Sequence, residues 1–462
     1  MVPSHPGRRS RGVASRASRP SRRTPAAGPR AAESEADPTR LEPVLTSEGR
    51  ALLDELGDVS GQDPLAVSTR LRALGHSADV VAAVLTQAGL RARARAKLGE
   101  DAAGLLLTRD GLEQATRPVV ARVHAQRLRE AGARRVADLG CGLGLDSLAF
   151  ARAGLEVTAV EKDPTVAAAA AANLAAHAGA HVETGDAVAW AGEHLAEPAP
   201  GEAVWLDPAR RRIGGGGTAR VFDPEAFSPP LSFVEALAAR GCTVGVKLGP
   251  GIPHEALSPE AEAQWVSVDG DVTEAVLWFG AARRPGVRRA ALALDTRGGQ
   301  VCSAELVSAE PPGGSPAVSA VGEEGMAGLV GHLLLEPDGA VIRAGLVTDL
   351  AVGLGPEVRL LDEHLAYLTA PEVPAHPLAR RYRVLAVQDL NLKALKRWAA
   401  ETGVGRLDVK KRGVALAPEQ VRARVLGSGR SRGGRHATLV LARVGEGRYA
   451  LEVEPLDDGG AR

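Results

Sequence analysis

Residues 136–163 read VADLGCGLGLDSLAFARAGLEVTAVEKD, and they hold the strongest local pattern of the chain. An apolar run ends at Leu139 and is followed by three glycines at a spacing of two: Gly140, Gly142 and Gly144. Glycines at this spacing let the backbone turn sharply and approach a ligand closely, because no side chain blocks the way. A helical pattern follows, and a second apolar run ends at Glu161. The stretch therefore predicts a strand, a turn, a helix and a parallel strand, which is the building unit of an open α/β sheet.

Acidic residues stand at the ends of successive predicted strands. They are Asp138, Glu161, Asp186 and Asp207, and consecutive members are 21 to 25 residues apart. Because the carboxyl ends of parallel strands share one edge of a sheet, we expect these carboxylates to line the ligand-binding edge. At its place after the glycine turn, Glu161 is expected to accept hydrogen bonds from the two ribose hydroxyls of an adenosine-type ligand.

The turn departs from the dinucleotide-binding pattern G-x-G-x-x-G, because Leu145 occupies the position of the last glycine. With Asp138 included, the segment reads D-x-G-x-G-x-G and resembles S-adenosylmethionine (SAM) dependent methyltransferases of the Rossmann-like class. The resemblance implies SAM as cofactor, with Asp186 beside the adenine. It also implies the cofactor-binding set Asp138, Gly140, Gly142, Gly144, Glu161 and Asp186. A glycine-rich turn without a ligand is the alternative.

The pattern downstream of the turn continues the sheet. Seven predicted strands span 135–139, 155–160, 181–184, 202–206, 243–248, 265–268 and 273–279. Asp269-Gly270 separates the last two and predicts a hairpin. We therefore expect a seven-stranded Rossmann-like methyltransferase sheet with an antiparallel last hairpin, within a domain of residues 131–282.

The fourth strand is followed by Asp207, Pro208, Ala209 and Arg210, where we place the catalytic site. Methylation needs an acceptor held in line with the methyl group and a base for any proton that leaves. Many methyltransferases of planar amines resemble one another in a motif of Asn, Asp or Ser, then Pro-Pro, then an aromatic. This chain has Ala209 and Arg210 instead, so a stacking face would have to come from Phe222 or Phe227.

The three arginines that begin at Arg210 suggest an anionic acceptor, such as a phosphate backbone. Asp207, Pro208 and Arg210 are thus the predicted catalytic residues. The alternative is that Asp207 and Pro208 only turn the chain and that the arginines form a solvated surface.

The chain has 462 residues and no net charge, with 56 Lys and Arg against 56 Asp and Glu. Its length predicts several domains. Three separated cysteines argue against a disulfide framework or a zinc site, and no apolar run approaches the roughly twenty residues of a membrane span. We expect a cytoplasmic protein without metal or membrane contact.

Residues 1–40 resemble a transit peptide in composition and are expected to form a disordered basic tail. Residues 41–130 are expected to be helical, 283–330 to be a linker of uncertain order, and 331–379 to be a connecting segment.

The pattern of strand and helix segments in residues 380–456 predicts a compact βαβαββ unit. Between Arg380 and Arg448 there are 17 basic and 5 acidic residues, an excess of 12 positive charges in a neutral chain. Such a charge favours a phosphate-backbone partner. Together with 336–345 and 405–413, the unit resembles the THUMP-like α+β domain of bacterial SAM-dependent methyltransferases, which implies RNA, either tRNA or rRNA, as the partner. The predicted RNA-binding residues are Lys410, Lys411, Arg412, Arg430, Arg432 and Arg435. A methyltransferase of a small molecule or protein, and a non-catalytic RNA-binding protein on a methyltransferase scaffold, are the alternatives.

Overall fold

The computed structural model describes residues 41–59, 61–210, 223–427 and 433–456, and the predicted tail 1–40 lies outside these ranges. The first described part is helical. Its helices are α1 (Glu42–Leu45), α2 (Ser47–Leu56), α3 (Pro64–Ala73), α4 (Ala78–Leu98), α5 (Arg109–Gln114) and α6 (Pro118–Glu130). Side-chain oxygens of Thr46, Asp63 and Ser77 accept backbone N–H groups in the first turns of α2, α3 and α4. These caps explain where the three helices begin.

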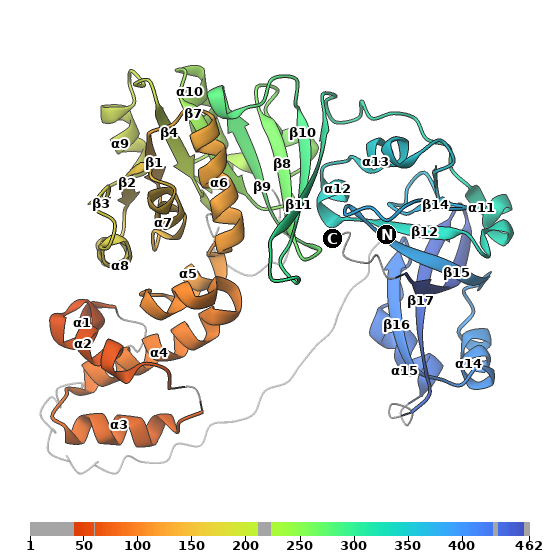
Figure 1. The fold of residues 1–462 in the computed structure, drawn as a ribbon, viewed down its shortest axis with the longest axis horizontal. Coiled ribbons are helices and arrows are strands. Elements are labelled where there is room, and N and C mark those ends of the chain that lie inside the picture. The colour runs from red at the N-terminus through yellow and green to blue at the C-terminus, as the bar shows by residue number, and fades with distance from the viewer. Residues whose placement is uncertain (1–40, 60, 211–222, 428–432, 457–462) are drawn as a thin grey trace, which may run out of the picture. The chain divides into compact units, whose positions relative to one another are not determined.

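A nine-stranded sheet follows, in the order β11-β10-β8-β9-β7-β4-β1-β2-β3 (Figure 1). Its strands are β1 (Arg135–Leu139), β2 (Glu156–Glu161), β3 (Ala180–Thr184), β4 (Glu202–Leu206), β7 (Thr243–Leu248), β8 (Glu262–Val268), β9 (Asp271–Phe279), β10 (Arg289–Asp295) and β11 (Cys302–Ser308). The five neighbouring strands β7, β4, β1, β2 and β3 are parallel to one another. β9 runs antiparallel to both β7 and β8. Asp269 and Gly270 turn the hairpin with φ angles of 56° and 95°. Positive φ at both residues is what a tight hairpin turn requires.

The prediction of seven strands was wrong, because β10 and β11 extend the sheet beyond the hairpin. β10 pairs in parallel with β8, and β11 pairs antiparallel with β10. Both strands fall in 283–330, for which we expected a linker of uncertain order. β10 reads RAALALD, and alanine has little preference for strands. Pairing with β8 therefore outweighs the local preference, and this is not visible in the segment by itself.

Helices cover both faces of the large sheet. One face carries α6, α7 (Leu145–Arg152) and α8 (Pro164–Leu174), and the other carries α9 (Ala187–His194) and α10 (Leu231–Ala239). Asp163 caps α8 and Pro164 is its first residue, as the sequence predicts. Successive side chains of a strand point to opposite faces. In β7, Val246 and Leu248 therefore pack toward α10, whereas Lys247 points toward α7 and toward Thr116, which lies just before α6.

A second sheet has the order β13-β14-β12-β15-β18-β17-β16. Its elements are β12 (Leu333–Pro337), α12 (Gly339–Arg343), α13 (Val347–Leu354), β13 (Arg359–Leu360), β14 (Leu368–Ala370), β15 (Ala379–Asp389), α14 (Leu392–Glu401), β16 (Val404–Arg412), α15 (Pro418–Leu426), β17 (Arg435–Val444) and β18 (Gly447–Pro455). From β15 onward the order is the predicted βαβαββ. The predicted connecting segment 331–379 contributes β12, β13 and β14 to this sheet.

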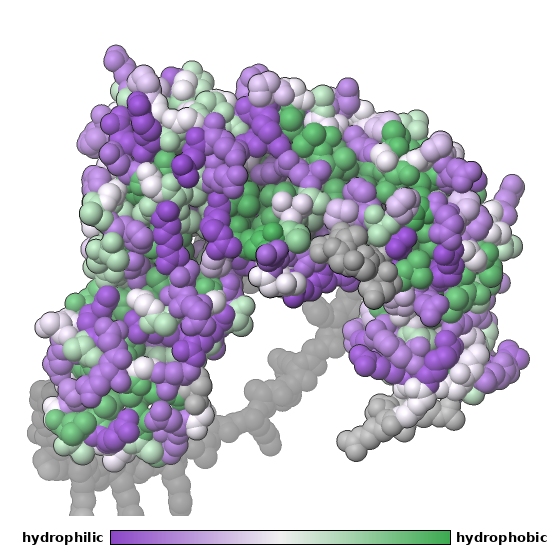
Figure 2. All heavy atoms as spheres, viewed as in Figure 1, coloured by the Kyte–Doolittle hydropathy of each residue, from purple (hydrophilic) through white to green (hydrophobic). Residues whose placement is uncertain are grey.

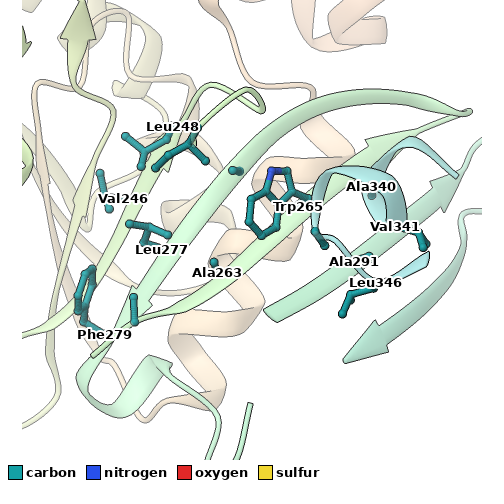
Figure 3. Packing of buried hydrophobic residues seen from close by; sticks show 14 of the residues in the cluster. Val246, Leu248, Ala263, Trp265, Leu277, Phe279, Ala291, Ala340, Val341 and Leu346 are labelled. Atoms are coloured by element: carbon teal, nitrogen blue, oxygen red, sulfur yellow. The ribbon is translucent and has the colours of Figure 1, made fainter. Parts of the chain in front are cut away.

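The segment 331–379 also packs on the large sheet. Buried residues of α12, among them Ala340 and Val341, belong to the same apolar cluster as Trp265 of β8 and Leu277 of β9 (Figure 3). Asp338 caps α12 and also accepts a hydrogen bond from Ser267 Oγ at 2.6 Å. Residues 331–379 therefore serve both sheets rather than only joining them.

The described chain also contains one short strand pair, β5 (Ala209–Arg210) with β6 (Phe227–Ser228), and the short helix α11 (Gly322–Gly325). Polar residues cover much of the visible face, and apolar residues show between them over the large sheet and the C-terminal part (Figure 2). Among the described residues, no helix combines the length and the apolar character that a membrane span requires.

Candidate active site

The glycine turn has the backbone geometry that its sequence predicts. Gly140, Gly142 and Gly144 have φ angles of 86°, 54° and 74°, a region that residues with a Cβ rarely adopt. A Cβ added to Gly140 or Gly142 would meet no atom within 4 Å, whereas one on Gly144 would lie 3.3 Å from Leu174. The first two glycines thus border open space that suits a closely bound ligand. The third allows the turn to pack on α8.

Glu161 lies across this turn. Its carboxylate accepts one hydrogen bond from Gly142 N at 3.0 Å and another from Asp163 N at 2.9 Å. The side chain is only partly buried, so oxygen lone pairs remain available at the open edge of the sheet. The position and the chemistry both fit the predicted role of binding ribose hydroxyls.

Asp138 lies inside the sheet rather than at its open edge. The residue is 1% exposed, and its carboxylate accepts a hydrogen bond from Ser147 Oγ at 2.5 Å. Burial raises the pKa of Asp138 to about 8, although the bond from Ser147 opposes this shift. At neutral pH the side chain is therefore largely protonated. Its contacts tie β1 to α7 on either side of the glycine turn.

Asp186 begins α9. One carboxylate oxygen accepts hydrogen bonds from Val188 N and Ala189 N, and the other lies 3.3 Å from Lys162 Nζ. The backbone bond from Ala189 is the largest influence and, with Lys162, lowers the pKa of this carboxyl despite some desolvation. Asp186 is thus an ionised helix cap at the end of β3, on the edge where the sequence places the adenine.

Asp207 follows β4, and the chain continues into the short strand β5. Within β5, Arg210 pairs through its backbone with Phe227. Phe227 is 5% exposed and belongs to the apolar core, so it offers no exposed stacking face. Phe222, the other candidate for stacking, lies outside the described residues, as do the two arginines that follow Arg210.

A buried cluster of charged groups surrounds Asp207. Lys247 Nζ lies 2.5 Å from Asp207 Oδ2, 2.8 Å from Thr116 Oγ1 and 4.0 Å from Asp146 Oδ2. Asp146 also accepts a hydrogen bond from Thr116 Oγ1 at 2.7 Å. Lys247 comes from β7 and Asp146 from α7. The cluster thus joins the end of β4 to residues far apart in the sequence.

His124 of α6 extends the cluster to β9. Its Nδ1 lies 3.2 Å from Asp146 Oδ1, and its Nε2 lies 2.6 Å from Glu274 Oε1. The imidazole is fully buried and also contacts the indole of Trp205, with ring centroids 4.3 Å apart. A chain of contacts therefore runs from Glu274 through His124, Asp146 and Lys247 to Asp207.

The pKa values of the cluster follow from this pairing. Burial opposes a charge on His124, but Glu274 and Asp146 outweigh it and raise the pKa of the imidazole to about 9. Burial likewise opposes a charge on Lys247, but Asp207, Asp146 and Glu274 raise the pKa of its ammonium. Burial raises the pKa of Asp207, and Lys247 opposes that shift. The cluster thus pairs the side chains of His124 and Lys247 with those of Asp146, Asp207 and Glu274.

The sequence interpretation missed His124, Asp146, Lys247 and Glu274. A usable signal existed for two of them. Lys247 is one of seven lysines in the chain and is the only charged residue of β7, and Glu274 directly precedes the apolar run that ends β9. Alternation along these strands predicts that both side chains share a face. His124 lies in α6, where nothing in the sequence marks it as a partner of β9.

The predicted RNA-binding residues of β16 point in two directions. Lys410 Nζ lies 2.6 Å from Glu336 Oε2, and Arg412 lies 3.8 Å from the other oxygen of the same carboxylate. Lys411, between them, is exposed on the opposite face. Arg435 pairs with Glu452 at 2.7 Å. Arg430 and Arg432 lie outside the described residues.

Cations that the sequence interpretation did not single out lie on α14. Lys393, Lys396 and Arg397 are all exposed. Because they are three and four residues apart, they form one stripe on the helix. Leu395 and Ala399 are buried on the other side. Within the described ranges, no group of three or more His, Cys, Asp or Glu side chains is arranged to hold a metal.

Two family models match parts of the chain. Residues 379–455 match the THUMP domain-like model, and residues 37–94 match a domain of unknown function, DUF8688. The structure of a putative methyltransferase from Porphyromonas gingivalis W83 covers 89% of this chain and 98% of its own, with a TM-score of 0.68 and 22% identity. This likeness concerns the fold.

Sequence relatives identify the family. An uncharacterized S-adenosylmethionine-dependent methyltransferase of Mycobacterium tuberculosis, found in strains CDC 1551 and H37Rv, is 32% identical over 370 residues. The match covers 78% of this chain and 91% of the relative. On this identity and coverage, the chain belongs to this family of SAM-dependent methyltransferases, and its C-terminal part is a THUMP-like domain.

Proposed function

We propose that the protein transfers the methyl group of SAM to structured RNA, either tRNA or rRNA. The observation that carries the proposal is the union of a methyltransferase domain with a THUMP-like unit that has an excess of 12 positive charges between Arg380 and Arg448. A concentrated positive field attracts a phosphate backbone. Base stacking contributes little, because the unit contains few aromatic residues.

The cofactor is held at the glycine turn in this proposal. Gly140, Gly142 and Gly144 form the turn around its methionine part, Glu161 binds the ribose and Asp186 lies at the adenine edge, while Asp138 supports the turn from inside. When bound, SAM supplies a methyl group on a positively charged sulfur.

The acceptor binds beside Asp207 in this proposal. Asp207 takes the proton that leaves the acceptor, and Pro208 sets the direction of the chain after β4. Arg210 contacts a phosphate next to the target nucleotide. The aromatic residue that stacks on planar amines has no counterpart at this position.

The RNA surface combines exposed and paired cations. Lys411 faces solvent and contacts phosphate directly, whereas Lys410, Arg412 and Arg435 exchange a carboxylate partner for phosphate when RNA binds. Arg430 and Arg432 belong to the same proposed surface.

Methyl-tritiated SAM tests the proposal when it is incubated with the protein and with the RNA, protein and small-molecule fractions of a cell extract. We expect label in the RNA fraction, and we expect it to disappear with Asp207→Asn. Asp79→Asn, which changes an exposed carboxylate in the first turn of α4, is the matched control. Label confined to protein or to small molecules would contradict an RNA substrate.

A further inference from the structure

Lys247 is the buried cation that contacts Asp207. Its side chain is 11% exposed, and its ammonium lies 2.5 Å from Asp207 Oδ2. Two further oxygens surround it, Thr116 Oγ1 at 2.8 Å and the backbone oxygen of Gln114 at 3.5 Å. An ammonium has three N–H groups. These three oxygens account for all of them, so none is left to contact a substrate.

Lys247 contacts one carboxylate oxygen of Asp207, Oδ2, and the other oxygen, Oδ1, remains available. Its side chain is 37% exposed, which is far more than that of Lys247. Oδ1 has no hydrogen-bond partner within the part of the chain that the structure describes. The free oxygen belongs to the residue that follows β4, where the acceptor is expected. Lys247 thus acts on the reaction through Asp207 and not by touching the substrate.

Further charged side chains lie close to the Lys247–Asp207 pair. Asp146 from α7 lies 4.0 Å from the ammonium, and Glu274 from β9 and Asp138 from β1 are close enough to influence the cluster. His124 from α6 balances Asp146 and Glu274. Without Lys247, Asp207 would face Asp146 and Glu274 with no adjacent cation, and its neutral form would be favoured.

We propose that Lys247 is a positioning residue for methyl transfer, which fixes Oδ2 of Asp207 and leaves Oδ1 to accept the proton of the methyl acceptor. The acceptor lone pair attacks the methyl carbon, and the carbon–sulfur bond breaks with its electron pair on sulfur. The acceptor proton passes to Asp207 and from there to water, which reaches this half-exposed side chain. This inference rests on the proposed role of Asp207 in catalysis.

The pH dependence of methyl transfer tests it. Rates are measured with whichever fraction accepts tritium, for the native protein, Lys247→Met and Lys247→Arg. Asp207 must be ionised to act as a base, so the rate falls on the acid side as pH drops through its pKa. Losing an adjacent opposite charge moves such a pKa by about one to three units. In the pH–rate profile of Lys247→Met, we therefore expect the fall on the acid side (the acid limb) to lie about one to three pH units higher than in the native protein. The rate of this variant should recover at high pH.

Two comparisons distinguish this role from a structural one. Lys247→Arg keeps the charge and should keep the acid limb close to its native position. Cofactor affinity, measured by calorimetry with SAM, should be unchanged in both variants, because Lys247 is not part of the cofactor site. A variant that is inactive at every pH, or an acid limb that does not move, would overturn the inference.

The proposed RNA substrate and the role of Lys247 can be tested independently. If label enters protein and not RNA, the RNA proposal is wrong while the pH test of Lys247 still applies. If no fraction is labelled, carbon-13 NMR of aspartate-labelled protein measures the pKa of Asp207 directly, with its resonance assigned from the spectrum of Asp207→Asn. An equal pKa in native protein and Lys247→Met would then overturn the inference.

Discussion

The Glu161 carboxylate, the proposed ribose ligand, is held by the backbone N–H groups of Gly142 and Asp163. This preorganisation means that little side-chain freedom is lost when a ribose binds. Removing its charged hydrogen bonds with Glu161→Ala should cost about 1.5 kcal/mol of binding free energy, which is roughly a ten-fold weaker SAM affinity. Isothermal titration calorimetry measures this directly.

A matched control is available on the same strand. Glu156 is exposed at the start of β2, at the opposite end from Glu161. Glu156→Ala should leave SAM affinity unchanged. Equal affinity in Glu161→Ala and native protein would show that the ribose is bound elsewhere.

His124 gives the molecule a stability that depends on pH. Its pKa is raised from 6.5 to about 9 in the folded state, so folding favours the protonated ring. The stabilisation is complete below pH 6.5 and is lost as pH rises through 9. We expect the free energy of unfolding to fall over this interval by more in the native protein than in His124→Gln.

Urea denaturation at a series of pH values from 6 to 10 provides the measurement. His181 is exposed at the edge of the large sheet, so His181→Gln serves as the control and should follow the native curve. Parallel curves for native protein and His124→Gln would mean that the ring does not carry the charge assigned to it.

The helix α14 presents the clearest basic stripe among the described elements. Lys393, Lys396 and Arg397 share its exposed side and have no ion-pair partner within the described ranges. If RNA lies along this helix, changing all three to Gln should weaken RNA binding. It should also reduce the slope of log K against log salt by about 2 to 3, since each phosphate contact contributes about 0.7 to 0.9.

Binding of total tRNA, measured by fluorescence anisotropy at several salt concentrations, tests the stripe. Arg70, Arg72 and Arg109 are exposed on helices of the N-terminal part, so their combined change to Gln is the matched control. An unchanged salt slope in the α14 variant would place the RNA on another surface.

Individual elements were predictable where a local pattern decides them. The strands 202–206 and 243–248 and the helices 392–401 and 418–426 have the bounds that their sequence patterns predict. Alternating or helical periodicity within each segment is sufficient for this. β10 was not predictable in this way, because its alanines become a strand only by pairing with β8.

In the candidate site too, contacts within a short stretch were predictable, whereas contacts between residues far apart in the sequence were not. The glycine turn and Glu161 lie within one short stretch, so their geometry follows from sequence. The pairing of His124 with Glu274 joins residues 150 positions apart. Likewise, Lys410 looked like a free cation in the sequence, and only the fold brings Glu336 next to it.

At the scale of the whole molecule, the described chain contains two sheets with a shared apolar core. The cluster that includes Leu206 and Val246 of the large sheet continues into Leu333 and Leu368 of the second. Buried Arg289 of β10 donates hydrogen bonds to the backbone oxygens of Ala344 and Gly345. The sequence suggested separate domains joined by a linker, because contacts between distant segments leave no local pattern.

Because the two sheets share this core, separating them would expose apolar side chains in both parts. A gene rearrangement that separated the methyltransferase part from the THUMP-like part would have to cut within 283–379. Either product would then expose leucine, valine and alanine side chains that are now buried, at about 25 cal/mol for each Å². A cut in this segment should therefore destabilise both products, because each loses the apolar partner that now covers it.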